Sequence, residues 1–135
     1  MSDERKAVVR SYYERVINGR DLDAVEEFFA DARMVEGVRR GCFSYFNAFP
    51  DLHVEITSTT CEGDCLVQEW VATGTHDGEL MGMAPTHKHV EFRGCAVGEV
   101  GDDGLEHRSA QSWEAMSLMQ QLGMTPAAAG AAGGA

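Results

Sequence analysis

The chain has 135 residues, of which 44% are hydrophobic, and a formal net charge of −11 at pH 7. This length suits one globular domain with one core. The excess of acidic side chains argues against nucleic acid or an anionic membrane surface as a partner. The sequence has neither an apolar run of the roughly 20 residues that a membrane span needs nor the pattern of a signal peptide, so we expect a cytoplasmic protein.

The first third of the chain has the periodicity of helices. Apolar side chains recur every three or four residues from Asp3 to Ile17, which predicts an amphipathic helix. Asp21 is a suitable N-cap for a second, short helix. A third helix is predicted from about Val38 to Ala48, and the proline that follows ends it. The apolar side of this third helix carries Cys42, Phe46 and Phe49.

The rest of the chain has the alternation and turn residues of strands. Four strands are predicted, at residues 53–60, 66–75, 89–100 and 105–114, with a short closing helix at 116–122. Helices followed by a meander indicate an α+β domain of residues 1–124, in which three N-terminal helices pack on the concave face of a bent antiparallel sheet. The alanine- and glycine-rich segment 125–135 is predicted to be disordered.

Three short blocks of sequence carry a more specific signal. They are residues 48–52 (Ala-Phe-Pro-Asp-Leu), residues 62–64 with 72–86, and residues 121–123 (Gln-Leu-Gly) after an acidic residue on the last strand. The run Gly-Thr-His-x-Gly-x-x-x-Gly-x-x-Pro-Thr at 74–86 is the most distinctive of them. Together with the helical start, the blocks extend over about residues 8–123. In them the chain resembles the SnoaL-like polyketide cyclase family, within the nuclear-transport-factor-2-like superfamily.

The resemblance implies a cone-shaped α+β fold, commonly dimeric, with a hydrophobic pocket between the sheet and the helices. Cyclases of this family act in secondary metabolism and antibiotic biosynthesis. They close rings in aromatic polyketides by intramolecular aldol condensation, without a metal or an organic cofactor. A carboxylate on the last strand is the general acid/base, and the resemblance places this role on Glu114, where the family usually has aspartate. The expected partners are a hydrophobic polycyclic or polyketide-derived molecule and a second copy of the chain.

The alternation of side chains along the last strand agrees with this assignment. It puts Glu106, Arg108 and Glu114 on one face, which is expected to be buried only around a polar site. A carboxyl group in an apolar pocket has a raised pKa that suits proton transfer, and Arg108 would stabilise an enolate oxygen. The alternative is a solvated outer face with weak ion pairs. We predict that both carboxylates point into a pocket. Its predicted aromatic lining is Trp70, Phe46 and Phe49.

Other polar and soft side chains offer weaker candidates. His76 and Met83, within the second block, are predicted to contact the substrate. The four cysteines do not have the paired spacings of a four-ligand zinc site, so no metal site is predicted. The meander also exposes a second sheet face, for which we predict a homodimer contact. The apolar residues assigned to that contact are Val67, Val71, Val90, Phe92 and Trp113.

One departure from the family pattern leaves other functions open. Residues 30–36 run almost directly into the third helix, where relatives usually have a strand, so one pocket wall is expected to be open or supplied by a partner subunit. Another reaction of the superfamily is the first alternative: hydroxylation-assisting, isomerising, epoxide-opening or cycloadding. For an epoxide-opening reaction, Glu106 and Glu114 would activate water. The second alternative is a non-catalytic dimer that binds a small ligand.

Overall fold

The computed structural model describes residues 2–123, so the predicted disordered tail lies outside the described residues. The elements follow in the order α1 (Ser2–Tyr12), η1 (Tyr13–Asn18), η2 (Leu22–Glu27), α2 (Ala32–Ala48), β1 (His53–Glu62), β2 (Cys65–Thr75), β3 (His89–Val100), β4 (Glu106–Trp113) and α3 (Ala115–Gln121). In this part of the chain, no helix is long and apolar enough to cross a membrane.

The N-terminal helix forms as its periodicity predicts. α1 continues without a break into a π-helical turn, η1, and the apolar stripe is buried along both. Its buried members are Val9, Tyr12, Tyr13, Val16 and Ile17. The predicted cap is also confirmed, because the Asp21 carboxylate accepts a hydrogen bond from the Ala24 N–H (3.3 Å) at the start of η2.

The helix α2 is longer than the sequence pattern predicted. It begins at Ala32 rather than near Val38, because Asp31 acts as the N-cap and accepts a hydrogen bond from the Arg33 N–H at 2.6 Å. The strand expected in this region is reduced to one parallel bridge between Phe29 and Glu106, at the outer edge of β4. Within residues 2–123, the rest of this β4 edge has no neighbouring strand.

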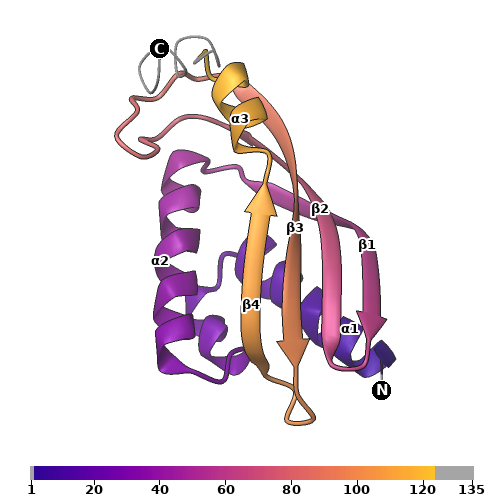
Figure 1. The fold of residues 1–135 in the computed structure, drawn as a ribbon. Coiled ribbons are helices and arrows are strands. Elements are labelled where there is room, and N and C mark those ends of the chain that lie inside the picture. The colour runs from indigo at the N-terminus through magenta and orange to yellow at the C-terminus, as the bar shows by residue number, and fades with distance from the viewer. Residues whose placement is uncertain (1, 124–135) are drawn as a thin grey trace, which may run out of the picture.

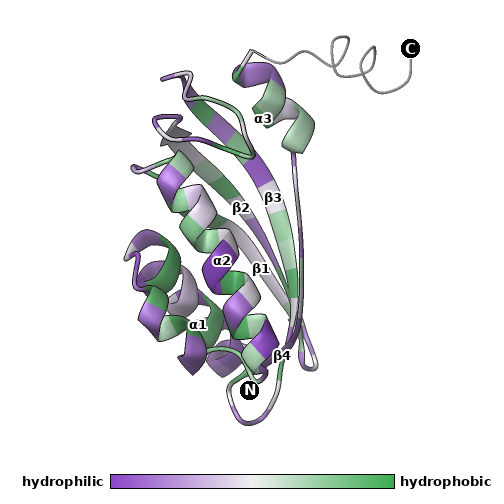
Figure 2. Ribbon diagram, turned by 90° about the vertical axis from the view of Figure 1, so that its left-hand side faces the viewer, coloured by the Kyte–Doolittle hydropathy of each residue, from purple (hydrophilic) through white to green (hydrophobic). Residues whose placement is uncertain are grey.

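The four strands form one antiparallel meander in the order β1-β2-β3-β4. The sheet curves, and α1 and α2 lie on its concave side (Figures 1 and 2). Concave-face side chains such as Leu66, Val90 and Phe92 are buried against these helices. The predicted α+β class, with N-terminal helices on a bent antiparallel sheet, is thus confirmed.

Beyond the end of β4, residues of the C-terminal segment form hydrogen bonds with the backbone at the free edge of β3. The Glu114 backbone N–H donates to the Arg93 carbonyl (2.9 Å), and the Glu114 carboxylate accepts from the Arg93 N–H (3.0 Å). The Gln121 amide then exchanges two hydrogen bonds with the backbone of Glu91, at 2.9 and 2.7 Å. These contacts replace a missing strand and hold α3 across the end of the sheet.

Candidate functional site

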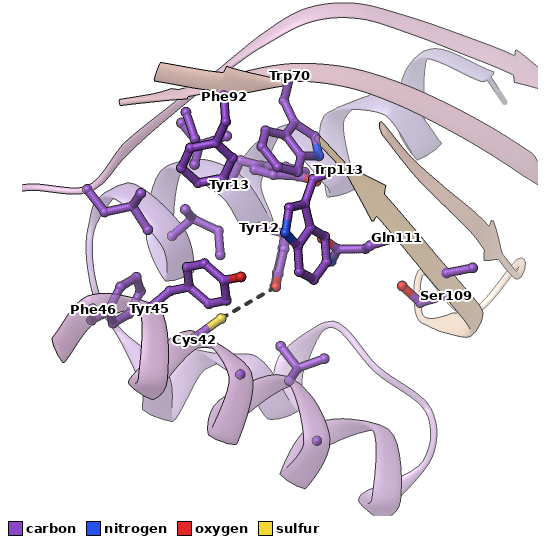
Figure 3. Close-up of a pocket in the computed structure, with 18 of the residues that line it drawn as sticks. Tyr12, Tyr13, Cys42, Tyr45, Phe46, Trp70, Phe92, Ser109, Gln111 and Trp113 are labelled. Atoms are coloured by element: carbon purple, nitrogen blue, oxygen red, sulfur yellow. Dashed lines mark hydrogen bonds between the residues drawn. The ribbon is translucent and has the colours of Figure 1, made fainter. Parts of the chain in front are cut away.

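A cavity of about 400 Å³ lies between α2 and the concave face of the sheet. Figure 3 shows aromatic side chains entering it from α1, η1, α2 and three strands. The aromatic lining consists of Tyr12, Tyr13, Tyr45, Phe46, Trp70, Phe92 and Trp113. Two of the three predicted pocket aromatics, Phe46 and Trp70, therefore line this cavity. A large apolar hollow with a few polar groups is the usual form of a small-molecule site.

The polar groups of the cavity are neutral. Among the described residues, none of those that line it carries a formal charge. Burial raises the pKa of the Tyr12 and Tyr13 hydroxyls, and the Tyr12 hydroxyl lies 4.0 Å from the Cys42 Sγ. Ser109 and Gln111 of β4 add a hydroxyl and an amide. Such a lining suits an uncharged molecule with carbonyl or hydroxyl groups, because a charged one would lose its hydration without compensation.

One end of the cavity is closed by an aromatic pair. The Tyr45 and Trp113 rings meet edge to face, with centroids 5.9 Å apart, across the gap between α2 and β4. On the sheet side, the Trp70 indole lies over Gly94, where any β-carbon would collide with it. Trp113 is 37% exposed, so this aromatic pair separates that end of the cavity from solvent.

A buried carboxyl group, that of Glu106, lies beside this cavity but is not part of its lining, so its predicted position in the pocket is not observed. Glu106 is only 8% exposed, and burial raises its pKa to about 7. Its Oε1 occupies the space that a β-carbon at position 98 would need, over the backbone of Gly98. Gly98 pairs directly with Ser109, which lines the cavity. After burial, the Glu106 carboxylate also contributes to the raised pKa of Tyr12 and Tyr13.

The prediction that Glu106 and Glu114 share a face is wrong. A β-bulge inserts His107 between the residues that pair with Val100 and Glu99, and this reverses the alternation of every later side chain. Arg108 consequently points to the outer face, where its guanidinium pairs with Glu99 at 3.1 Å. Glu114 is exposed and contacts the β3 edge instead of the cavity. The proton-transfer role predicted for Glu114 stays a prediction: this residue borders a second hollow, with Trp70 and Trp113, and does not line the aromatic cavity.

The first two sequence blocks form a junction between α2 and the β2–β3 connection. Phe49 is fully buried and packs against Gly74, where a β-carbon would crowd its ring, and it also contacts the His76 ring with centroids 5.6 Å apart. The Asp51 carboxylate accepts hydrogen bonds from the Thr75 N–H (2.6 Å) and hydroxyl (2.8 Å). Phe49 therefore supports the fold at this junction and is absent from the cavity lining, contrary to its prediction.

His76 and Met83 also lie away from the cavity lining. His76 is fully buried, and its Nδ1 accepts a hydrogen bond from the Thr86 N–H (3.2 Å), which leaves the proton on Nε2. Met83 pairs with Leu80 across a tight turn. The predicted substrate contacts of these two residues are not observed; both instead order the loop between β2 and β3.

Several cavity residues were missed from the sequence. Tyr45, Ser109, Gln111 and Trp113 line the cavity but were not assigned to it. The last three follow the inward alternation that begins after the bulge, so no simple pattern on the strand would have selected them. A helical stripe at Met34, Val38, Cys42 and Tyr45 did offer a usable signal.

Comparisons with known proteins agree with this architecture. The family model described as SnoaL-like polyketide cyclase matches residues 7–122. The chain belongs to this family. No curated protein sequence matches the chain.

Solved structures of other proteins show the same fold at low identity. AclR from Streptomyces galilaeus, described as a putative hydroxylase, is 24% identical, with a TM-score of 0.80 over 93% of this chain and 85% of its own. IdmH from Streptomyces antibioticus is also 24% identical, with a TM-score of 0.76 over 89% and 99% of the two chains. A SnoaL-like polyketide cyclase from Agrobacterium tumefaciens is 17% identical, with a TM-score of 0.74 over 88% and 98%.

Proposed function

We propose that this SnoaL-like protein closes a ring in a neutral, hydrophobic, polyketide-derived molecule, and that Glu106 is its general acid/base. The observation that carries this proposal is a single buried carboxyl group, with its pKa raised to about 7, beside an uncharged aromatic cavity. A group that titrates near neutral pH can both accept and return a proton during one turnover. Glu114 lacks this environment, because it is exposed and bound to the β3 edge.

The proposed reaction is an intramolecular aldol closure. The Glu106 carboxylate removes a proton from a methylene group next to a ketone, and the resulting enolate carbon attacks a second carbonyl carbon of the same molecule. A carbon–carbon bond forms, and the electron pair of the attacked carbonyl moves to its oxygen. The protonated Glu106 then returns the proton to this alkoxide, so that the enzyme ends in its starting state. The apolar cavity keeps water away from the enolate.

The first half of this reaction can be measured with a simple flat ketone. We expect the protein to accelerate the exchange of the hydrogens next to the carbonyl of β-tetralone for deuterium in deuterium oxide. Proton NMR measures the rate of this exchange. Glu106→Gln should slow the protein-catalysed exchange by about 10²–10⁴-fold, the usual effect of removing one positioned acid/base group. Glu114→Gln is the matched control and should exchange like the wild type. The opposite result, with only Glu114→Gln impaired, would return the catalytic role to Glu114.

A non-catalytic ligand-binding function is the second candidate. It is favoured by the absence of any charged side chain from the described lining of the cavity. In that case the protein would bind β-tetralone without accelerating exchange in either the wild type or the variants. Binding and exchange measured on the same sample therefore separate the two functions.

The proposed assembly is a homodimer formed through the outer face of the sheet. Val67 pairs with Val97, and Val97 pairs with Ala110, so these residues form a row across β2, β3 and β4 on this face, although Ala110 also borders the cavity. Val71 lies four residues further along β2 and has the same alternation. Of the residues predicted for the contact, Val90 and Phe92 are buried on the concave face, and Trp113 lines the cavity, so those three assignments are wrong. The remaining apolar row is the basis for the dimer.

A further inference from the structure

Two glycines stand one turn apart in the interior of α2, at Gly37 and Gly41. Glycine is among the least favourable residues in a helix interior. In most helices such a glycine allows a close approach by another element, but a β-carbon at either position would meet no described atom within 4 Å. Neither glycine is therefore required by the packing of the described residues.

Both glycines line the aromatic cavity, and both are exposed to solvent. Ser109 and Gln111 line the cavity from β4, the strand that forms its other side. Figure 3 shows these two side chains opposite the α2 helix. The β4 edge is paired only at its start, through the Phe29–Glu106 bridge, so no strand covers the gap between β4 and α2 in the described structure.

We propose that Gly37 and Gly41 form the entrance of the cavity and set the width of the ligand that it admits. The ligand class is a flat, fused-ring carbonyl compound without formal charge. Its rings would lie between the glycine face of α2 and the Trp70 and Trp113 indoles, and its polar edge would meet Ser109 and Gln111. This inference rests on the proposed function for the use of the cavity, and it names the residues that select by size.

The two tryptophans of the sequence, Trp70 and Trp113, both line the cavity, so intrinsic fluorescence reports its occupation. We would measure the quenching of this fluorescence by two neutral probes, tricyclic hydroxyanthraquinone and bicyclic β-tetralone. Gly41→Leu and Gly37→Leu place a branched side chain in the entrance. Ser44→Leu is the matched control, because Ser44 is an exposed α2 residue outside the described lining. Gly41→Ala adds one methyl group while favouring the helix.

The proposal predicts a loss that depends on ligand size. Gly41→Leu or Gly37→Leu should weaken hydroxyanthraquinone binding by about 10- to 100-fold, as expected for overfilling a packed site, and should weaken β-tetralone binding much less. Ser44→Leu and Gly41→Ala should bind both probes within about threefold of the wild type, as surface substitutions usually do. A selective loss of the larger probe cannot arise from a failure to fold, because unfolding removes the binding of both.

Three results would overturn the inference. The first is unchanged hydroxyanthraquinone binding in both leucine variants. The second is an equal loss of affinity for the two probes. The third is a wild type whose tryptophan fluorescence is quenched by neither probe. Failure of the proposed function looks different: the leucine variants at positions 37 and 41 would still lose the larger probe selectively, yet the wild type would not accelerate ketone exchange.

Discussion

One extra residue in β4 determines which of its side chains face the helices and which face outward. Strict alternation along a strand predicts that residues 106 and 114 point the same way, and the sequence around His107 contains no glycine or proline to signal a bulge. Glu106 points inward before the bulge, and the bulge shifts the alternation of all later side chains by one residue. As a result, Gln111 and Trp113 face the cavity. Burial of Glu106 could be predicted from the sequence, but its separation from Glu114 could not.

The raised pKa of Glu106 makes the stability of the protein depend on pH. Its pKa is about 7 in the folded state against 4.5 in the unfolded state, so the folded protein binds the extra proton between these values. Unfolding free energy should therefore fall as pH rises from about 4.5 to 7, by at most about 3 kcal/mol from this group, and then level off. Urea unfolding at pH 5 and pH 8 measures this change. Glu106→Gln should lose this component, and an identical pH dependence in the variant would contradict the assignment.

The Glu106 carboxyl can occupy its position only because residue 98 is a glycine and has no β-carbon. A methyl group there would collide with Oε1 and displace the acid. Gly98→Ala should therefore slow proton transfer by about 10²-fold, the effect of misplacing a reacting group by roughly 1 Å. Adding Gly98→Ala to Glu106→Gln should cause little further loss, because the displaced group is already disabled in Glu106→Gln. Full additivity of the two effects in the exchange assay would argue that Glu106 does not act at this place.

At the scale of elements, periodicity predicted most of the architecture. The helices and strands appear where their patterns place them, because each apolar side is buried against the shared core. The start of α2 was missed although Asp31 before Ala32 is a readable N-cap. The three sequence blocks that resemble the family contain contacts that connect elements: Asp51 binds Thr75, and Gln121 binds Glu91. A sequence motif alone does not distinguish a residue that connects two elements from a catalytic residue.

The hydrogen bonds between Gln121 and Glu91 should contribute measurably to the stability of the fold. Its amide makes two hydrogen bonds to the Glu91 backbone, in place of a neighbouring strand. Gln121→Ala should lower the unfolding free energy by about 1–2 kcal/mol, since each such bond contributes roughly 0.5–1.5 kcal/mol. Gln120→Ala is the control, because Gln120 is exposed. Chemical denaturation checks both variants, and equal stability of Gln121→Ala and the wild type would show that α3 is held by its apolar contacts alone.

At the scale of the whole molecule, the two faces of the sheet have different tasks. The concave face holds the cavity, and the outer face carries the half-buried row that includes Val67 and Val97. We expect a dimer in sedimentation experiments at micromolar concentration, and Val67→Asp should shift it to monomer by placing a charge in the contact. Thr60→Asp, on the neighbouring strand β1, tests whether the contact extends to the sheet edge. A wild type that sediments as a monomer throughout this range would contradict the outer-face dimer.

We propose Glu106 as the acid/base group of the site. The most direct test of this proposal is a carbon-13 NMR titration of the glutamate side-chain carboxyl signals, with Glu106 assigned by the signal that disappears in Glu106→Gln. We expect this carboxyl to titrate with a pKa of about 7, well above the 4.5 of an exposed glutamate. A Glu106 signal that titrates at or below the ordinary glutamate value would mean that the carboxyl is solvated and would contradict its proposed role.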